Sequence, residues 1–244
     1  MRGLHGNPCN SLPTMQQLIL DIAPQPAPSF ENFITAENDE LIDVLRIKAL
    51  KHDHEPQLYL WGTAGSGKTH LLKACVLAAQ KLDRSAAYFD TEDFSAAPSL
   101  EFDLIAIDNV GLLDDAAQIK LFNLINRVRE EHGRLLVAGS ARPAFLPLRE
   151  DLTTRLAWNL VYQVHPLSDA DKLYALTRIA RERGFELQGG VAEYLMRHWR
   201  RDLPSLIGAI ESLDRHSLQL QRPVTVPLLK ELLAQSSHKH IEST

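Results

Sequence analysis

The sequence has few cysteines, no excess of positive charge and no long apolar run. Of its 244 residues only two are cysteines, Cys9 and Cys75. This count excludes a framework of disulfide bonds and favours a reducing compartment. Lysine and arginine number 26 against 31 acidic residues, a net charge of −5. Proteins that bind nucleic acid through its phosphates are basic, so this balance weakens the case for direct DNA binding.

Apolar residues near the start, in "QLILDI" at residues 17–22, form a stretch far shorter than the ~20 residues that a membrane-spanning helix needs. The first residues also lack a basic segment followed by an apolar core, which a signal peptide requires. We therefore expect no membrane association and a cytoplasmic location. Whether residues 1–14 belong to the mature protein stays open, since Met15 is a second candidate start.

With 45% hydrophobic and 23% charged residues, the chain can bury a sizeable core. Short, nearly continuous apolar runs alternate with helical patterns, which indicates a parallel sheet covered by helices on both faces. We expect an α/β domain with a five-stranded parallel sheet. Its strands are predicted at residues 57–61, 86–89, 104–107, 134–139 and 159–164.

After His165 the pattern is helical only, beginning with Ser168 as an N-cap and Asp171 three residues later. A small all-helical lid domain is therefore expected to follow the sheet. The predicted parts are a tail at residues 1–29, the α/β domain at 30–165, the helical lid domain at 166–236 and a tail at 237–244.

The segment "GTAGSGKT" fits the phosphate-loop pattern in full, after a strand and before a helix. In this context a merely tight glycine turn is a weaker interpretation. Backbone N–H groups would surround the phosphates, and Lys68, expected at the loop's surface, would reach the β- and γ-oxygens. The candidate nucleotide-binding residues are Gly62, Thr63, Ala64, Gly65, Ser66, Gly67, Lys68 and Thr69.

A second acidic site lies about 40 residues later, where the strand pattern "LIAI" ends in Asp108. Thr69 and Asp108 are the predicted Mg²⁺ residues. In ATPases of this broad class an acid usually follows that aspartate, but here the position is Asn109, whose amide can orient a water but cannot accept its proton. We therefore expect ATP or ADP binding with weak or no intrinsic hydrolysis.

These residues resemble the DnaA-related AAA+ ATPases, and within them the regulatory inactivators of DnaA. The resemblance covers residues 17 to about 234. It rests on "QLILDI", "WGTAGSGKTHLLKA", "IDNV", "RLAWNLVYQVHPL", "PLSDADKLYAL", "RGFEL" and "RPVTVPLL". A DnaA-type initiator also carries a DNA-binding domain after the lid and a helical insertion before the Mg²⁺ strand. In this sequence the corresponding segment, Asp90 to Phe102, is too short for two helices, so we expect it to lack that insertion.

The resemblance assigns Arg155 as an arginine finger, which acts on nucleotide held by a neighbouring subunit. The alternative is a surface arginine paired with Asp151, one turn earlier. Ser140 takes the sensor 1 position. Pro204 stands where many relatives have a lid arginine, and whether Arg200 or Arg201 replaces that arginine stays open.

Phe33 and Ile34, in "FENFI", match the segment that flanks adenine in these relatives, with plain core packing as an equal alternative. Near the start, Gln17, Leu18, Leu20 and Ile22 resemble the short peptide by which bacterial proteins bind the sliding clamp of DNA polymerase III. A proline-rich spacer at residues 23–29 follows it.

The resemblance thus implies a negative regulator of replication initiation, tethered to the clamp, that stimulates ATP hydrolysis by the initiator DnaA through Arg155. DNA would be contacted only indirectly, through the clamp. A helicase-loader-like or other replisome ATPase acting by its own turnover is the alternative, and a small-molecule phosphotransferase is a weaker one. The preferred nucleotide, ATP or ADP, and a nucleotide-dependent homo-oligomer stay open.

Overall fold

The computed structural model describes residues 27–50, 56–98, 100–131, 133–158, 160–200 and 202–238. The predicted clamp-binding residues lie outside these ranges, as does Arg201. The predictions for them therefore rest on the sequence alone. Those clamp-binding residues are Gln17, Leu18, Leu20 and Ile22.

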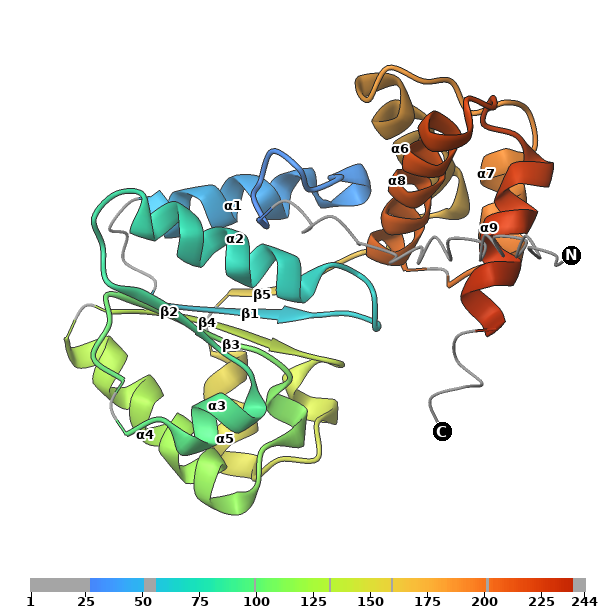
Figure 1. Cartoon of the computed structure of the whole chain (residues 1–244). Helices are drawn as coiled ribbons and strands as arrows, with labels where there is room; N and C mark the ends of the chain where they lie inside the picture. Colours follow the sequence, from blue (N-terminus) through green and yellow to red (C-terminus); the bar gives the residue numbers. More distant parts are fainter. Residues whose placement is uncertain are drawn as a thin grey trace, which may run out of the picture.

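Five parallel strands form one sheet in the order β2-β3-β4-β1-β5, which confirms the predicted sheet (Figure 1). Strands β1 and β4 lie inside the sheet and are almost entirely buried, because their sequences are nearly continuous apolar runs. The strands are β1 (Gln57–Trp61), β2 (Ala86–Phe89), β3 (Leu104–Ile107), β4 (Arg134–Gly139) and β5 (Leu160–Gln163).

Helices cover both faces of the sheet (Figure 1). Side chains of successive strand residues alternate between the two faces, so Leu58 and Leu60 pack with one cluster and Tyr59 with the other. On one face lie α1 (Asp39–Leu50) and α2 (Lys68–Gln80). On the other lie α3 (Thr91–Ala96), α4 (Asp115–Glu130) and α5 (Glu150–Ala157). Short 3-10 helices are η1 (Ala36–Asn38), η2 (Val110–Leu112) and η3 (Pro143–Phe145).

The lid contains four helices among the described residues, with their own apolar cluster. The predicted capping box is present, since Ser168 Oγ accepts from the backbone N–H of Asp171 and the Asp171 carboxylate accepts from that of Ser168. Pro204 lies in the first turn of the third lid helix, after the N-cap Asp202. The helices are α6 (Asp169–Glu182), α7 (Val191–His198), α8 (Leu203–Leu220) and α9 (Val226–His238).

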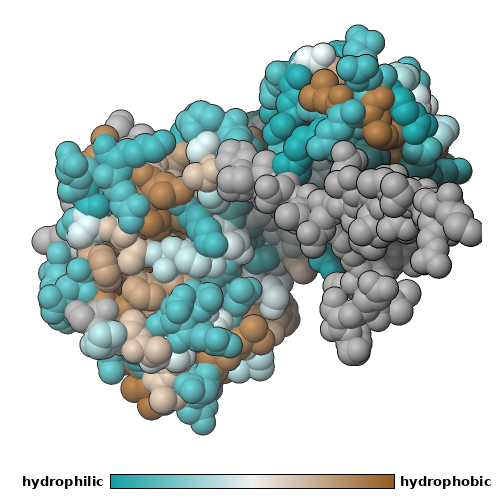
Figure 2. Space-filling model, viewed as in Figure 1, coloured by the Kyte–Doolittle hydropathy of each residue, from teal (hydrophilic) through white to brown (hydrophobic). Residues whose placement is uncertain are grey.

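The surface visible in Figure 2 mixes hydrophilic and apolar side chains, and the coloured part of the lid that faces the viewer is mostly hydrophilic. Within the described ranges, no helix has the length and apolar character needed to cross a membrane.

Candidate functional site

The phosphate loop joins the carboxyl end of β1 to the amino end of α2. Gly65 and Gly67 adopt left-handed backbone angles, with φ of +77° and +100°, which side chains other than glycine rarely accept. At Gly62 a β-carbon would lie 2.5 Å from the carbonyl oxygen of Val164. The loop therefore needs glycine at these three positions to keep its shape.

The loop presents polar groups suited to a phosphate. The first N–H groups of α2 have no partner within the helix, and a helix amino end attracts anions. Ser66 Oγ is buried and has no hydrogen-bond partner among the described residues. These features fit a bound nucleotide phosphate, whose oxygens are acceptors only.

Lys68 is buried, with 8% of its surface exposed, so the expectation that it lies at the loop's surface is wrong. Its Nζ donates to the carbonyl oxygens of Gly62 and Thr63, at 2.7 Å and 2.9 Å. Burial lowers the pKa of the amine, while the nearby Asp108 carboxylate acts in the opposite direction. Two carbonyl groups of the loop thus bind the ammonium group, which is consistent with the burial of the lysine.

Asp108 is fully buried at the carboxyl end of β3 and accepts three hydrogen bonds. Its Oδ2 accepts from Thr69 Oγ1 at 2.5 Å and from the Tyr88 hydroxyl at 3.1 Å, and its Oδ1 accepts from the backbone N–H of Asn109. The structure thus brings Thr69 and Asp108 together, as a shared Mg²⁺ site requires. In the described part of the chain no group of three or more His, Cys, Asp or Glu side chains could hold a metal.

A Mg²⁺ ion at this place would be held by one carboxylate, one hydroxyl, phosphate oxygens and waters, which is the usual ligand set for Mg²⁺ beside a nucleotide. Tyr88 was not predicted as a site residue. Its strand "AAYF" reads as core packing, and only the pairing of β2 beside β3 shows that its hydroxyl reaches Asp108. The pKa of this hydroxyl is raised, first by burial and then by Asp108.

Asn109 and Ser140 are exposed at the same edge of the sheet as the phosphate loop. Asn109 has a left-handed backbone with φ of +53°, a conformation that asparagine tolerates better than most residues. Ser140 follows β4, which lies between β1 and β3 in the sheet. Both residues therefore stand at the edge where a γ-phosphate would lie, and their roles stay predictions.

Phe33 packs over the phosphate loop. A β-carbon at Gly67 would lie 2.7 Å from its ring, and its ring centre is 5.5 Å from that of His70. His70 Nε2 donates to the carbonyl of Ser29 at 2.9 Å, and burial lowers the pKa of the imidazole. Ile34 is half-buried. Phe33 thus combines core packing with a position beside the loop, so both interpretations of "FENFI" remain.

Arg155 lies on α5, away from the phosphate loop. Its backbone carbonyl is 3.4 Å from Nε2 of Gln57, the first residue of β1, whereas the phosphate loop follows the last residue of β1. Asp151 pairs with Arg149 at 2.9 Å, so the alternative pairing with Arg155 is not formed. Arg155 instead lies over the rings of Trp158 and Phe122.

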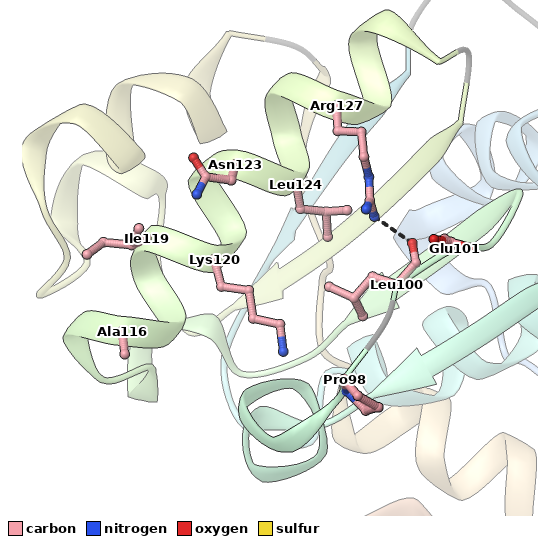
Figure 3. A pocket seen from close by; sticks show the side chains of 9 residues that line it. All are labelled: Pro98, Leu100, Glu101, Ala116, Ile119, Lys120, Asn123, Leu124 and Arg127. Carbon is pink, nitrogen blue, oxygen red and sulfur yellow. Dashed lines mark hydrogen bonds between the residues drawn. The ribbon is translucent and has the colours of Figure 1, made fainter.

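A groove of about 530 Å³ lies between α4 and the segment before β3 (Figure 3). Two cations line it, but both donate to backbone carbonyls, Lys120 to Phe94 and Ala97 and Arg127 to Leu100. These hydrogen bonds connect α4 with the segment that precedes β3. Both cations of the groove thus serve a structural joint, and the other charged side chain that lines it is Glu101.

On the lid side, Arg200 is exposed and precedes α8 by three residues. Pro204 has no polar side chain with which to contact a phosphate, as the sequence already indicated. A replacement of the missing lid arginine by Arg200 stays a prediction.

Comparison with known proteins identifies the fold, and a family model matches the lid domain. Residues 169–233 match the family model described as "Hda, lid domain". The domain III structure of DnaA from Thermotoga maritima matches with TM-score 0.70 and 21% identity over 86% of this chain and 98% of that one. AMPPCP-bound DnaA from Aquifex aeolicus matches with TM-score 0.65 and 21% identity over 80% and 69%.

A further solved structure, a replication initiator DnaA bound to AMPPCP and single-stranded DNA, matches with TM-score 0.67 and 22% identity. The alignment covers 77% of this chain and 64% of that one, so the chain spans less than two thirds of that initiator. These likenesses show the fold of an AAA+ domain with a helical lid. Two of these DnaA structures are bound to the adenine nucleotide analogue AMPPCP.

Proposed function

Because the chain is a DnaA-related, Hda-like AAA+ protein, we propose that it is a negative regulator of DNA replication initiation. In this proposal it binds adenine nucleotide, is tethered to the sliding clamp by its first residues and stimulates ATP hydrolysis by DnaA in trans. It acts less as an independent enzyme than as a partner that completes the active site of another protein.

The position of Arg155 is the observation that carries the proposal. Arg155 and the phosphate loop lie at opposite ends of β1, a strand of five residues that spans roughly 13 Å. Arg155 therefore cannot serve the nucleotide site of its own chain. Among the described residues it has no carboxylate partner, so its charge is available to a second subunit. A guanidinium stabilises the charge that develops on a transferring phosphoryl group.

The nucleotide site supports binding more than turnover. The loop, Lys68 and the pair of Thr69 and Asp108 would hold the phosphates and Mg²⁺, and the nucleotide would supply the negative charge that these donors are arranged to receive. Asn109 cannot take a proton from an attacking water, and Pro204 cannot contact a phosphate. Bound ATP or ADP would thus act as a fixed component that organises the protein.

The clamp tether is proposed from the sequence of residues 17–22. Gln17 would donate to and accept from a small polar pocket, while Leu18, Leu20 and Ile22 would contact an apolar groove. A short peptide loses entropy when it becomes ordered, so we expect modest and reversible affinity.

The test is a reconstituted assay with the chain, ATP-bound DnaA and clamp loaded on DNA. We expect hydrolysis only when all components are present, and a loss on the order of 10³-fold in stimulation for Arg155→Ala. Arg178→Ala, which removes an exposed arginine of α6 that pairs with Glu182 and does not contact Arg155, is the matched control and should retain stimulation. Substantial hydrolysis by the chain alone would instead favour an ATPase that acts by its own turnover.

A further inference from the structure

The guanidinium of Arg155 lies over two aromatic rings. Its central carbon is 4.2 Å from the centre of the Trp158 indole and 5.2 Å from that of Phe122. Trp158 follows Arg155 by three positions at the end of α5, a spacing that places two side chains side by side, whereas Phe122 comes from α4. One ring is thus supplied locally and the other by the packing of α4 against α5.

Trp158 is 55% exposed, so packing of the core does not require a ring of this size here. A second cation, Arg129 on α4, lies 5.5 Å from the centre of the same indole. Trp158 and Arg155 also line a shallow groove of about 410 Å³ together with Phe122 and Thr154. The indole therefore stands at the surface where a partner would meet Arg155.

We propose that Trp158 is a positioning residue for Arg155, an inference that rests on the proposed function. A cation over an aromatic face is attracted by the ring, which leaves the N–H groups of the guanidinium free for an acceptor. Among the described residues no acceptor receives a hydrogen bond from the Arg155 side chain, and Asp151 is already bound to Arg149. The rings thus order the guanidinium before the partner's phosphate arrives, without neutralising its charge.

The size of the effect follows from the contact. A cation–π contact of about 1–2 kcal/mol corresponds to about 5- to 30-fold in rate, at 1.36 kcal/mol per tenfold. Because the ordering matters in the transition state, the loss should appear in the maximal rate and not in the affinity of the two proteins.

The experiment measures stimulated hydrolysis by DnaA at increasing concentrations of the chain. Trp158→Leu should lower the maximal rate about 5- to 30-fold with an unchanged half-saturating concentration, and Trp158→Phe should retain at least half of the rate. Arg129→Gln is the matched control, since it removes the other cation over the indole and should leave the rate unchanged. An unchanged rate in Trp158→Leu, or a change in half-saturation alone, would overturn the inference.

A second readout is independent of the partner. Ring currents of the indole should shift the NMR signals of the Arg155 side-chain δ-protons upfield. This shift should fall in Trp158→Leu, where only the more distant Phe122 ring remains, but persist in Trp158→Phe. If Arg155→Ala keeps full stimulation, the proposed function fails, and the NMR shift alone then decides whether Trp158 orders Arg155. If Arg155→Ala loses stimulation while Trp158→Leu keeps both the rate and the shift, only the positioning role fails.

Discussion

Lys68 shows how a single residue links the loop's shape to its chemistry. Its Nζ donates to two loop carbonyls, and a bound phosphate would offer it charged acceptors instead. We expect Lys68→Ala to weaken nucleotide binding about 10- to 100-fold and to lower the stability of the loop by about 1 kcal/mol, since two carbonyls lose their donor. Calorimetry with Mg²⁺-ADP and thermal melting measure both effects. Lys81→Ala, after the far end of α2, is the control, and unchanged affinity in Lys68→Ala would contradict the phosphate-loop assignment.

Tyr88 contributes through Asp108 and not by direct contact with a nucleotide. Removing its hydroxyl in Tyr88→Phe takes one of three donors from a fully buried carboxylate. Loss of such a supporting bond commonly weakens a metal site 10- to 100-fold, so we expect a fall of about that size in the Mg²⁺-dependent part of nucleotide affinity. Titrations with and without Mg²⁺ separate this effect from general damage. An equal fall in both titrations would show that Tyr88 only packs.

Asn109 is the residue on which weak intrinsic hydrolysis chiefly depends. Aspartate tolerates the left-handed backbone angle at this position, so Asn109→Asp adds a carboxylate with little strain. We expect several-fold faster ATP hydrolysis by the chain alone, because the carboxylate can accept a proton from the attacking water. Phosphate release is the measurement, with Asn123→Asp on the exposed side of α4 as the control for added charge. If hydrolysis does not become faster, Asn109 is not what limits it. Pro204, which stands where many relatives have a lid arginine, is then the next candidate.

Among the elements, α6 connects the sheet to the lid, and its capping box fixes where it begins. Ser168→Ala removes the cap and should cost about 1 kcal/mol. This corresponds to roughly 5-fold faster hydrogen exchange of the first α6 amides, measured by mass spectrometry. Ser205→Ala is the matched control, because in α8 the backbone N–H of Ser205, and not its side chain, is bonded to the cap Asp202. Equal exchange in both variants would show that packing alone sets the start of α6.

The elements were predictable where their signals are local. The strands agree with the sequence prediction to within one residue, because each is an apolar run between turns, and α6 begins where Ser168 and Asp171 predict it. Nonlocal pairings were not predictable. Helical spacing suggests that Asp151 pairs with Arg155. In the structure Asp151 pairs with Arg149 instead, and Arg155 lies over aromatic rings from α4 and from the end of α5. Burial of Lys68 likewise depends on how the loop folds over it.

In the whole molecule, the first residues of the α/β domain are joined to the connection that leads to the lid. The Asn38 amide donates to the carbonyl of His165 at 3.0 Å, and its oxygen accepts from the backbone N–H of His165 at 2.8 Å. The preceding Val164 carbonyl lies so near the phosphate loop that a β-carbon at Gly62 would be 2.5 Å from its oxygen. The start of the domain, the loop and the lid connection thus meet at one place, while Arg155 lies at the other end of β1.

This division of the molecule leads to the last prediction, on the tail. Replacing Gln17, Leu20 and Ile22 together with alanine should abolish clamp binding but leave nucleotide affinity and melting temperature unchanged. The described apolar clusters are built from Phe30 onward, and the proline-rich residues 23–29 separate the peptide from them. Clamp binding is measured by surface plasmon resonance, with Gln16→Ala just before the peptide as the control.

In the same triple variant, stimulation of DnaA on clamp-loaded DNA should fall sharply, because tethering raises the effective concentration and can strengthen binding ~10²–10⁴-fold. A high concentration of the variant should restore much of the stimulation, since Arg155 is still present. Arg155→Ala should behave in the opposite way, with full clamp binding and no stimulation at any concentration. The two variants thus distinguish the loss of clamp tethering from the loss of the arginine that stimulates hydrolysis. If the triple variant melts at a lower temperature than the unaltered protein, the peptide belongs to the folded core and the tether proposal fails.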